Sequence, residues 1–273
     1  MKRLKLQAAI LATIASSSYA SDTCLPPDIG TPLEVFQCIE AKIDRQQEEI
    51  QALKKRWALT YGLVAYYPFD GNANDKSGNG NHGTMHGGVD YVAGRIGQAA
   101  YFDGVDDYIN VSDVSSFEIR DEASFCFSMN FEQGGSENPR ILAVVDDSSR
   151  YFDIFTWADY SGGVSSNFRH ISYSPNYQAE KHIKQQQVNV SEWYDICFVT
   201  NKDTHNLYIS GKLIETTLNQ KGLTFNTGWL YIGRHSGICS GICDRYKGIL
   251  DEIRIYNRAL SKYEIQQLYQ MGN

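Results

Sequence analysis

The chain has 273 residues, with 25 basic and 32 acidic side chains and a formal net charge of −7. A net acidic chain with no basic cluster is a poor match for nucleic acid or anionic lipid, so we exclude these two classes of partner. Its 18 Tyr, 12 Phe and 23 Gly residues, with few long helical patterns, favour an all-β body.

The first twenty residues are typical of a secretory signal peptide. Residues 1–5 carry three positive charges, residues 6–14 form a short apolar core, and Ser18 and Ala20 supply small side chains for cleavage after Ala20. The apolar run is too short to span a bilayer as a helix, and no later stretch is apolar enough, so we predict no membrane insertion. We expect a protein that is secreted or held at the cell surface or in the periplasm, with a net charge of −10 after cleavage because the signal holds three basic and no acidic residues.

The segment 21–60 is predicted to be a proline-rich lead followed by an amphipathic helix. Apolar residues of the helix, over 36–57, recur at alternating spacings of three and four, which is the pattern of a coiled coil, although Gln46 interrupts it. Two interpretations fit. Either the helix assembles a homo-oligomer through residues 36–57, or it packs locally on the rest of its own chain.

From Gly62 onward the pattern changes to strands. Residues 124–131 and 193–199 alternate, and Cys126 and Cys197 each fall on the face opposite the main apolar row. If the two strands are antiparallel neighbours, these cysteines lie within disulfide distance, so we predict a Cys126–Cys197 bridge.

All six cysteines follow the signal, and an even number in an exported chain favours three disulfides over a zinc site, whose common spacings are not matched. Proximity along the chain predicts the other two bridges, Cys24–Cys38 and Cys239–Cys243.

The remaining elements follow from local signals. Residues 207–214 predict a tight hairpin that turns at Ser210 and Gly211, and residues 229–233 and 248–256 predict further strands. Ser261, with Glu264 three residues later, predicts a capping box at the start of a short closing helix.

Three stretches together resemble the laminin-G-like jelly-roll family of the concanavalin A-like lectin/glucanase superfamily. They are GLVAYYPFDGNANDKSGNGNHGTMHG (62–87) with GRIGQAAYFDGVDDYINV (94–111), the central strands with the 193–214 segment, and LDEIRIYNRALSKYEI (250–265). The resemblance implies that residues 61–273 form a two-sheet antiparallel jelly-roll sandwich, preceded by the coiled-coil-like helix and closed by the short C-terminal helix. It also implies a module that binds glycan or a protein partner, in many cases with calcium.

A calcium site is predicted in the loop 70–81, where oxygen-bearing side chains alternate with glycines. The predicted ligands are Asp70, Asp75 and Asn79, joined by Asp251 from the closing segment that the family pattern shares. The competing interpretation is a turn whose Asp and Asn side chains bond their own backbone. A second acidic group, Asp103, Asp106 and Asp107, flanks a tight turn, and we rank it behind the first loop as a metal site.

Catalysis is not expected. Retaining glycanases need two carboxylates about 5 Å apart, and no strand carries such a pair at the right spacing. The histidines are scattered, and no nucleophile elbow or zinc-protease motif occurs.

Ligand-binding candidates are Trp157, Asn167 and Tyr173 in the aromatic-rich segment 146–177, and Arg234 in a later loop. Aromatic faces stack on sugar rings, while planar polar side chains hold hydroxyl groups. The sequence therefore predicts a secreted, non-catalytic binding or adhesion module that recognises glycan or a surface partner and carries structural calcium. The alternatives are a structural oligomer without a small ligand and, third, a glycoside hydrolase of the concanavalin-like class.

Overall fold

The computed structural model describes residues 31–132, 134, 139–145, 151–158, 166–173, 180–181, 189–218, 224–225, 227–235 and 244–272. The chain divides into two compact units, Met1–Trp57 and Ala58–Asn273, and each is described by itself. The predicted signal peptide and Cys24, Cys239 and Cys243 lie outside the described residues.

Helix α2 (Pro32–Thr60) contains the predicted helix and extends beyond it at both ends. Several large apolar side chains along it are exposed, among them Phe36, Ile50 and Leu53. Among the described residues, no helix combines the length and the hydropathy that crossing a membrane requires.

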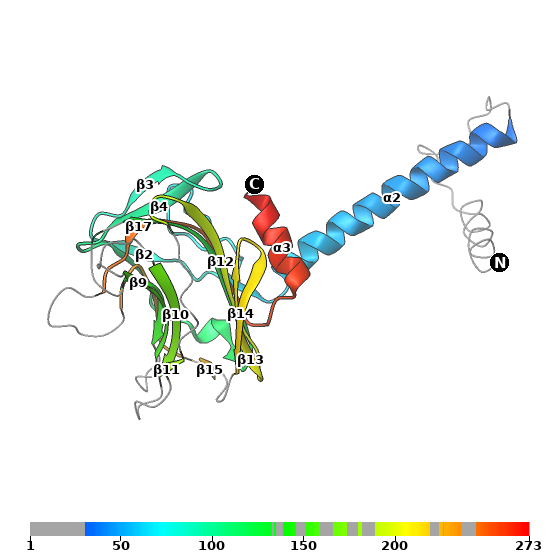
Figure 1. Ribbon diagram of the computed structural model, residues 1–273. Coiled ribbons are helices and arrows are strands. Elements are labelled where there is room, and N and C mark those ends of the chain that lie inside the picture. The colour runs from blue at the N-terminus through cyan, green and yellow to red at the C-terminus, as the bar shows by residue number, and fades with distance from the viewer. Residues whose placement is uncertain are drawn as a thin grey trace. The chain divides into compact units, whose positions relative to one another are not determined.

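One sheet of the second unit has eight strands, in the order β14–β13–β12–β7–β17–β4–β3, with β1 also pairing with β17 (Figure 1). All pairings are antiparallel. The strands are β1 (Leu63–Tyr67), β3 (Asp90–Ala93), β4 (Gln98–Asp103), β7 (Ala123–Phe131), β12 (Trp193–Thr200), β13 (Thr204–Ile209), β14 (Lys212–Leu218) and β17 (Lys247–Tyr256).

The other large sheet has seven antiparallel strands, in the order β11–β10–β9–β8–β16–β5–β2. They are β2 (Thr84–His86), β5 (Tyr108–Val111), β8 (Arg140–Val145), β9 (Tyr151–Ala158), β10 (Ser166–Tyr173), β11 (Glu180–Lys181) and β16 (Trp229–Ile232). A short pair, β6 (Ile119–Arg120) with β15 (Thr224–Phe225), and a 3-10 turn, η1 (Ser115–Phe117), complete the unit. The predicted two-sheet antiparallel sandwich is therefore confirmed.

The main core lies between the two sheets. Strand β7 contributes Phe125, Phe127, Met129 and Phe131, which are at most 2% exposed and belong to one cluster with buried aliphatic residues of the seven-stranded sheet. The apolar row that the sequence predicted for strand β12 packs into the same cluster. The alternating pattern in the sequence thus identified the inward face of both strands.

A second, smaller cluster lies on the opposite face of β7 and β12. Cys126 and Cys197 are register partners there and form a disulfide with a Cα–Cα distance of 4.1 Å, which confirms the predicted bridge. Helix α3 (Lys262–Met271) lies beside the eight-stranded sheet (Figure 1), and its Ile265 belongs to this cluster. Cys38 is also disulfide-bonded, and its partner lies outside the described residues, so the Cys24–Cys38 pair stays a prediction, as does Cys239–Cys243.

Two local predictions are also confirmed. Ser210 and Gly211 have φ angles of 48° and 73° and turn the hairpin between β13 and β14, as the left-handed preference of glycine allows. Ser261 and Glu264 form both hydrogen bonds of a capping box at the start of α3.

Arg258, just after β17, ties together both ends of the second unit. Its Nη2 donates to the carbonyl of Ala58 at 2.6 Å, and its Nε donates to the carbonyl of Tyr61 at 2.8 Å. The same guanidinium forms an ion pair with Glu264 of α3 at 2.6 Å. One side chain therefore holds the segment where the chain enters the sandwich and the helix that closes it.

Candidate functional site

Polar and aromatic side chains gather on the outer face of the seven-stranded sheet, at β2, β5 and β16. Ile109, Val111, Leu230 and Ile232 are buried in the core, with at most 2% exposure. Because side chains of a strand alternate between its two faces, the intervening residues lie on the outer face. These are Tyr108 and Asn110 on β5 and Trp229 and Tyr231 on β16, with His86 opposite Tyr108 in the register of β2.

The ring of Tyr108 is the centre of this group. The His86 ring stacks on it at 4.3 Å with an interplanar angle of 7°, and the Arg234 guanidinium lies 4.4 Å from its centroid. The Arg245 guanidinium is 5.3 Å away, and the Tyr231 ring is at 6.4 Å. We call these five residues the cation–aromatic cluster. Contacts of this length are typical of cation–π pairs.

The two arginines of the cluster are held in place by their own hydrogen bonds. Arg234 Nε donates to the carbonyl of His235 at 2.9 Å, and Arg245 Nη1 donates to the carbonyl of Asp106 at 3.1 Å. Burial and the neighbouring charge of Arg234 lower the pKa of Arg245, which indicates that the two cations lie close together. Fixed guanidinium groups beside aromatic rings can donate hydrogen bonds to the hydroxyl or carboxylate oxygens of a ligand.

Trp229 extends the same face. It is 39% exposed and lies two residues from Tyr231, which is half-buried. An exposed indole on a rigid strand offers an apolar plate of the kind that packs against the C–H face of a sugar ring. The outer face thus combines an aromatic plate with fixed hydrogen-bond donors.

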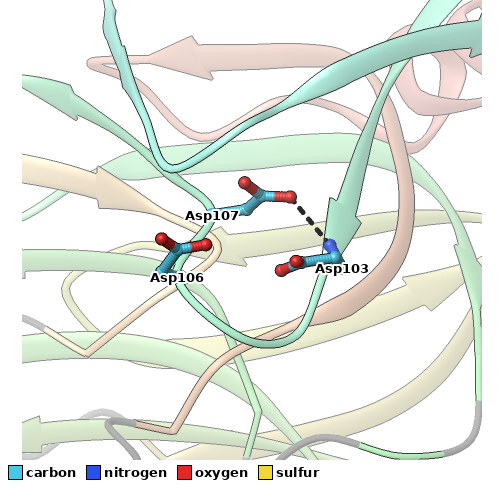
Figure 2. A group of neighbouring side chains, drawn as sticks. All are labelled: Asp103, Asp106 and Asp107. Carbon is cyan, nitrogen blue, oxygen red and sulfur yellow. Dashed lines mark hydrogen bonds between the residues drawn. The ribbon is translucent and has the colours of Figure 1, made fainter.

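An acidic group borders the cluster, in the loop between β4 and β5 (Figure 2). Asp103, Asp106 and Asp107 have carboxylate oxygens within 4.8 Å of one another, and they are the one such group of at least three acidic, histidine or cysteine side chains among the described residues. Asp107 accepts hydrogen bonds from the N–H groups of Gly88 and Asp103, and Asp103 accepts one from Val105. Burial, followed by the charges of Asp103 and Asp106, raises the pKa of Asp107. The Asp106 carboxylate has no hydrogen-bond partner among the described residues.

The predicted calcium ligands are arranged differently. Asp75 Oδ1 accepts from the N–H groups of Tyr66 and Ser77, and its Oδ2 accepts from the Ser77 hydroxyl and the N–H of Asn81, all at 2.8–2.9 Å. Asn79 donates its side-chain amide to the carbonyl of Leu63 at 2.9 Å. Donors therefore surround the Asp75 carboxylate, and a cation would have to displace them.

Asp70 and Asp251 bracket a different turn, between β3 and β4. Asp70 accepts from the N–H of Gln98 at 2.9 Å, and Asp251 accepts from the N–H groups of Arg95 and Ile96 at 2.8 and 3.0 Å. Asp70, Asp75 and Asp251 do not form a group of carboxylates within 4.8 Å of one another. The hydrogen-bond donors around these carboxylates fit a role in holding the loops in place better than a role in coordinating calcium. The predicted site at 70–81 stays a prediction.

Three of the predicted ligand-binding residues lie on β9 and β10, and their side chains are outside the described part of the structure. Trp157 and Asn167 are register partners, and Tyr173 is opposite Tyr151. The fourth, Arg234, belongs to the cation–aromatic cluster. The other four members of the cluster were not predicted from the sequence. Their only signal is the alternation of β5 and β16, in which Tyr108 and Tyr231 take the outward positions.

The comparisons with known proteins agree with this architecture. The sequence profile of the concanavalin A-like lectin/glucanases superfamily matches residues 103–266. No curated protein matches the chain. Domain 4 of AbnA, a GH43 extracellular arabinanase from Geobacillus stearothermophilus, solved in complex with arabinotriose, superposes with a TM-score of 0.61 at 21% identity over 76% of this chain and 98% of the domain.

Two toxin binding domains share the fold. The binding domain of Paraclostridial Mosquitocidal Protein 1 has a TM-score of 0.55 at 17% identity over 78% of this chain. That of Botulinum neurotoxin DC, solved in complex with rat synaptotagmin II, has a TM-score of 0.54 at 14% identity over 79% of this chain. This chain spans about half of each toxin domain, 53% and 52% respectively.

Proposed function

Because the chain belongs to the concanavalin A-like lectin/glucanase superfamily, we propose that its sandwich is a non-catalytic module that binds carbohydrate outside the cell. The observation that carries this proposal is the outer face of the seven-stranded sheet, where the exposed Trp229 adjoins the cation–aromatic cluster. Carbohydrate sites combine aromatic plates with planar polar groups in this way. A fold alone does not define a ligand, so the residues of this face support the proposal.

The structural neighbours support a binding function. Domain 4 of the arabinanase was solved with arabinotriose, and the two toxin structures are binding domains. At these low sequence identities the similarity shows a shared fold only, so the ligand of this chain has to be identified by experiment. Carbohydrate is our choice because Trp229 and Arg234 supply both kinds of contact that a sugar ring needs.

The buried carboxylates support a non-catalytic role. Glu252 forms an ion pair with Arg254 and accepts from the hydroxyl of Tyr66 at 2.9 Å. The Asp251 carboxylate accepts hydrogen bonds from three backbone N–H groups, those of Arg95, Ile96 and Glu252. These side chains are engaged in holding strands and turns, whereas a glycanase pair needs one carboxylate as nucleophile and one as acid.

Export is supported by the disulfide. The Cys126–Cys197 bridge is 4–5% exposed at each cysteine, and such bridges persist in oxidising compartments. Together with the signal peptide predicted at residues 1–20, the bridge supports a site of action at the cell surface, in the periplasm or in the surrounding medium.

Calcium enters the proposal as a structural ion. Both oxygens of Asp75 already accept hydrogen bonds, whereas the Asp106 carboxylate has no acceptor role among the described residues. Any calcium dependence of stability is therefore assigned by comparing Asp75→Ala, in the predicted loop 70–81, with Asp106→Ala, in the second acidic group.

A glycan array tests the proposed function. The purified protein should bind a defined set of glycans, and Trp229→Ala and Arg234→Gln should each weaken that binding by about tenfold or more. Tyr263→Ala is the matched control, because Tyr263 is an exposed aromatic residue (62%) on α3. Silence on the array, or full binding by both the Trp229 and the Arg234 variants, would remove the proposed site.

A further inference from the structure

Helix α2 carries an exposed apolar stripe. Phe36, Ile50, Leu53 and Trp57 are 50%, 49%, 59% and 64% exposed. With the half-buried Ile39 and Ile43 and the polar Gln46 between them, these residues follow alternating spacings of three and four over 22 residues, or about 33 Å of helix. An amphipathic helix normally buries such a stripe against a partner.

The spacing of the stripe specifies what kind of partner fits. A repeat of 3.5 residues keeps the apolar seam facing a second helix only when the two wind around each other and carry the same repeat. The seam contains no charged residue. Lys42 and Glu49 occupy flanking positions, so both signs of charge border the seam, and residues 54–56 near its C-terminal end are all basic.

Gln46 points to an identical copy in particular. It takes the place of an apolar residue in the middle of the seam, where a purely apolar partner would leave its amide without hydrogen bonds. A carboxamide has both donors and an acceptor, so the Gln46 amides of two copies can bond each other. A single polar residue in a coiled-coil seam commonly fixes the register of the strands in this way.

We propose that α2 associates with α2 of further copies of this chain in a short coiled coil, which makes the protein a homo-oligomer. This inference does not depend on the proposed carbohydrate binding. If both proposals hold, one oligomer carries several carbohydrate-binding faces. The effective concentration of the second face is then high once the first has bound, so the oligomer binds a surface more tightly than a single chain does.

The test is the mass of the purified protein, residues 21–273, measured by light scattering at tens of micromolar and on dilution. We expect the wild type to have a multiple of the single-chain mass. The double change Ile50→Glu and Leu53→Glu, which puts two charges into the seam, should weaken assembly at least about 100-fold and give a monomer. The double change Gln51→Glu and Ala52→Glu is the matched control, since it adds the same two charges at exposed positions outside the seam and should leave the mass unchanged.

Two further measurements keep the outcome clear. Phe36→Glu, at the other end of the seam, should also lower the mass, and the melting of the sandwich should be the same in all variants. A wild type that is monomeric at tens of micromolar overturns the inference, and so does a seam variant that keeps the wild-type mass. An oligomer that binds nothing on a glycan array would retain this inference and remove the proposed function.

Discussion

Replacing Asp75 by Ala tests what holds the loop 70–81 in place. The Asp75 side chain is 6% exposed and accepts four hydrogen bonds. The donors are the N–H groups of Tyr66, Ser77 and Asn81, at 2.9, 2.8 and 2.9 Å, and the Ser77 hydroxyl at 2.8 Å. The substitution therefore leaves three backbone donors without their acceptor.

The expected loss follows from those three donors. A buried donor that loses its acceptor costs about 1–3 kcal/mol, and more where the acceptor was charged. The bonds to Tyr66 and Ser77 are only partly buried, so water can replace some of them after the change. We expect Asp75→Ala to lower the free energy of unfolding by about 3–5 kcal/mol, and Asp75→Asn, which keeps one acceptor oxygen, by less.

The measurement is urea unfolding in two buffers, one with calcium and one with a chelator. If hydrogen bonds hold the loop, the loss caused by Asp75→Ala is the same in both buffers. Asp106→Ala is the control, because its carboxylate has no hydrogen-bond partner among the described residues. In chelator it should lie within about 0.5 kcal/mol of the wild type.

Three results would refute this reasoning or relocate the ion. A loss below about 0.5 kcal/mol in Asp75→Ala would show that the four hydrogen bonds do not hold the loop. A loss seen only in calcium, matched by the effect of the chelator on the wild type, would make Asp75 a cation ligand, as the sequence first suggested. A calcium response that survives in Asp75→Ala and disappears in Asp106→Ala would place the ion at the Asp103, Asp106 and Asp107 group.

Two further predictions concern the larger sheet. Replacing both Cys126 and Cys197 by Ala opens a loop of 71 residues, and loop-closure entropy predicts a loss of about 4 kcal/mol in the free energy of unfolding; a loss below about 1 kcal/mol in urea unfolding would contradict this. Burial raises the pKa of Asp251 from 3.8 to about 7, so the folded state binds the proton more tightly than the unfolded state. The contribution of this carboxyl group to the free energy of unfolding therefore falls as the pH rises from about 4 to 7. The destabilisation caused by Asp251→Asn should therefore shrink as the pH rises across that window, and a difference that does not change with pH would show that Asp251 titrates normally.

Much of the sandwich could be predicted because strand periodicity is a local signal. The alternation in residues 124–131 and 193–199 gave the inward faces of β7 and β12, and the faces in turn placed Cys126 opposite Cys197. The turn at Ser210 was equally local, since neighbouring residues alone determine it. Such features need no knowledge of which strands meet.

The candidate site could not be predicted in the same way. Its members come from positions 86, 108, 231, 234 and 245, and they meet only because β2, β5 and β16 are neighbours in one sheet. Sequence alone gives neither that strand order nor the register that puts His86 opposite Tyr108. Arg234 was selected for its residue type and its loop, without its partners.

The loop 70–81 shows a different limit. Asp and Asn residues separated by glycines suit a calcium loop and a self-bonded turn equally well, because both use the same oxygens. What separates the two is the direction of the backbone N–H groups. In this structure those of Tyr66, Ser77 and Asn81 point at Asp75. Composition carries no information on that direction.

The bonds of Arg258 have a mechanical consequence. If the protein is held through α2 while a ligand pulls on the sandwich, tension enters the second unit at residues 58–61. The carbonyls of Ala58 and Tyr61 accept hydrogen bonds from Arg258 there. The next backbone bond along the chain joins the N–H of Asn257 to the carbonyl of Gly62, and those between β1 and β17 follow from the pair Leu63 and Tyr256. Force therefore reaches the middle of the eight-stranded sheet through β17, and the bonds of Arg258 must break before that strand pair is loaded alone.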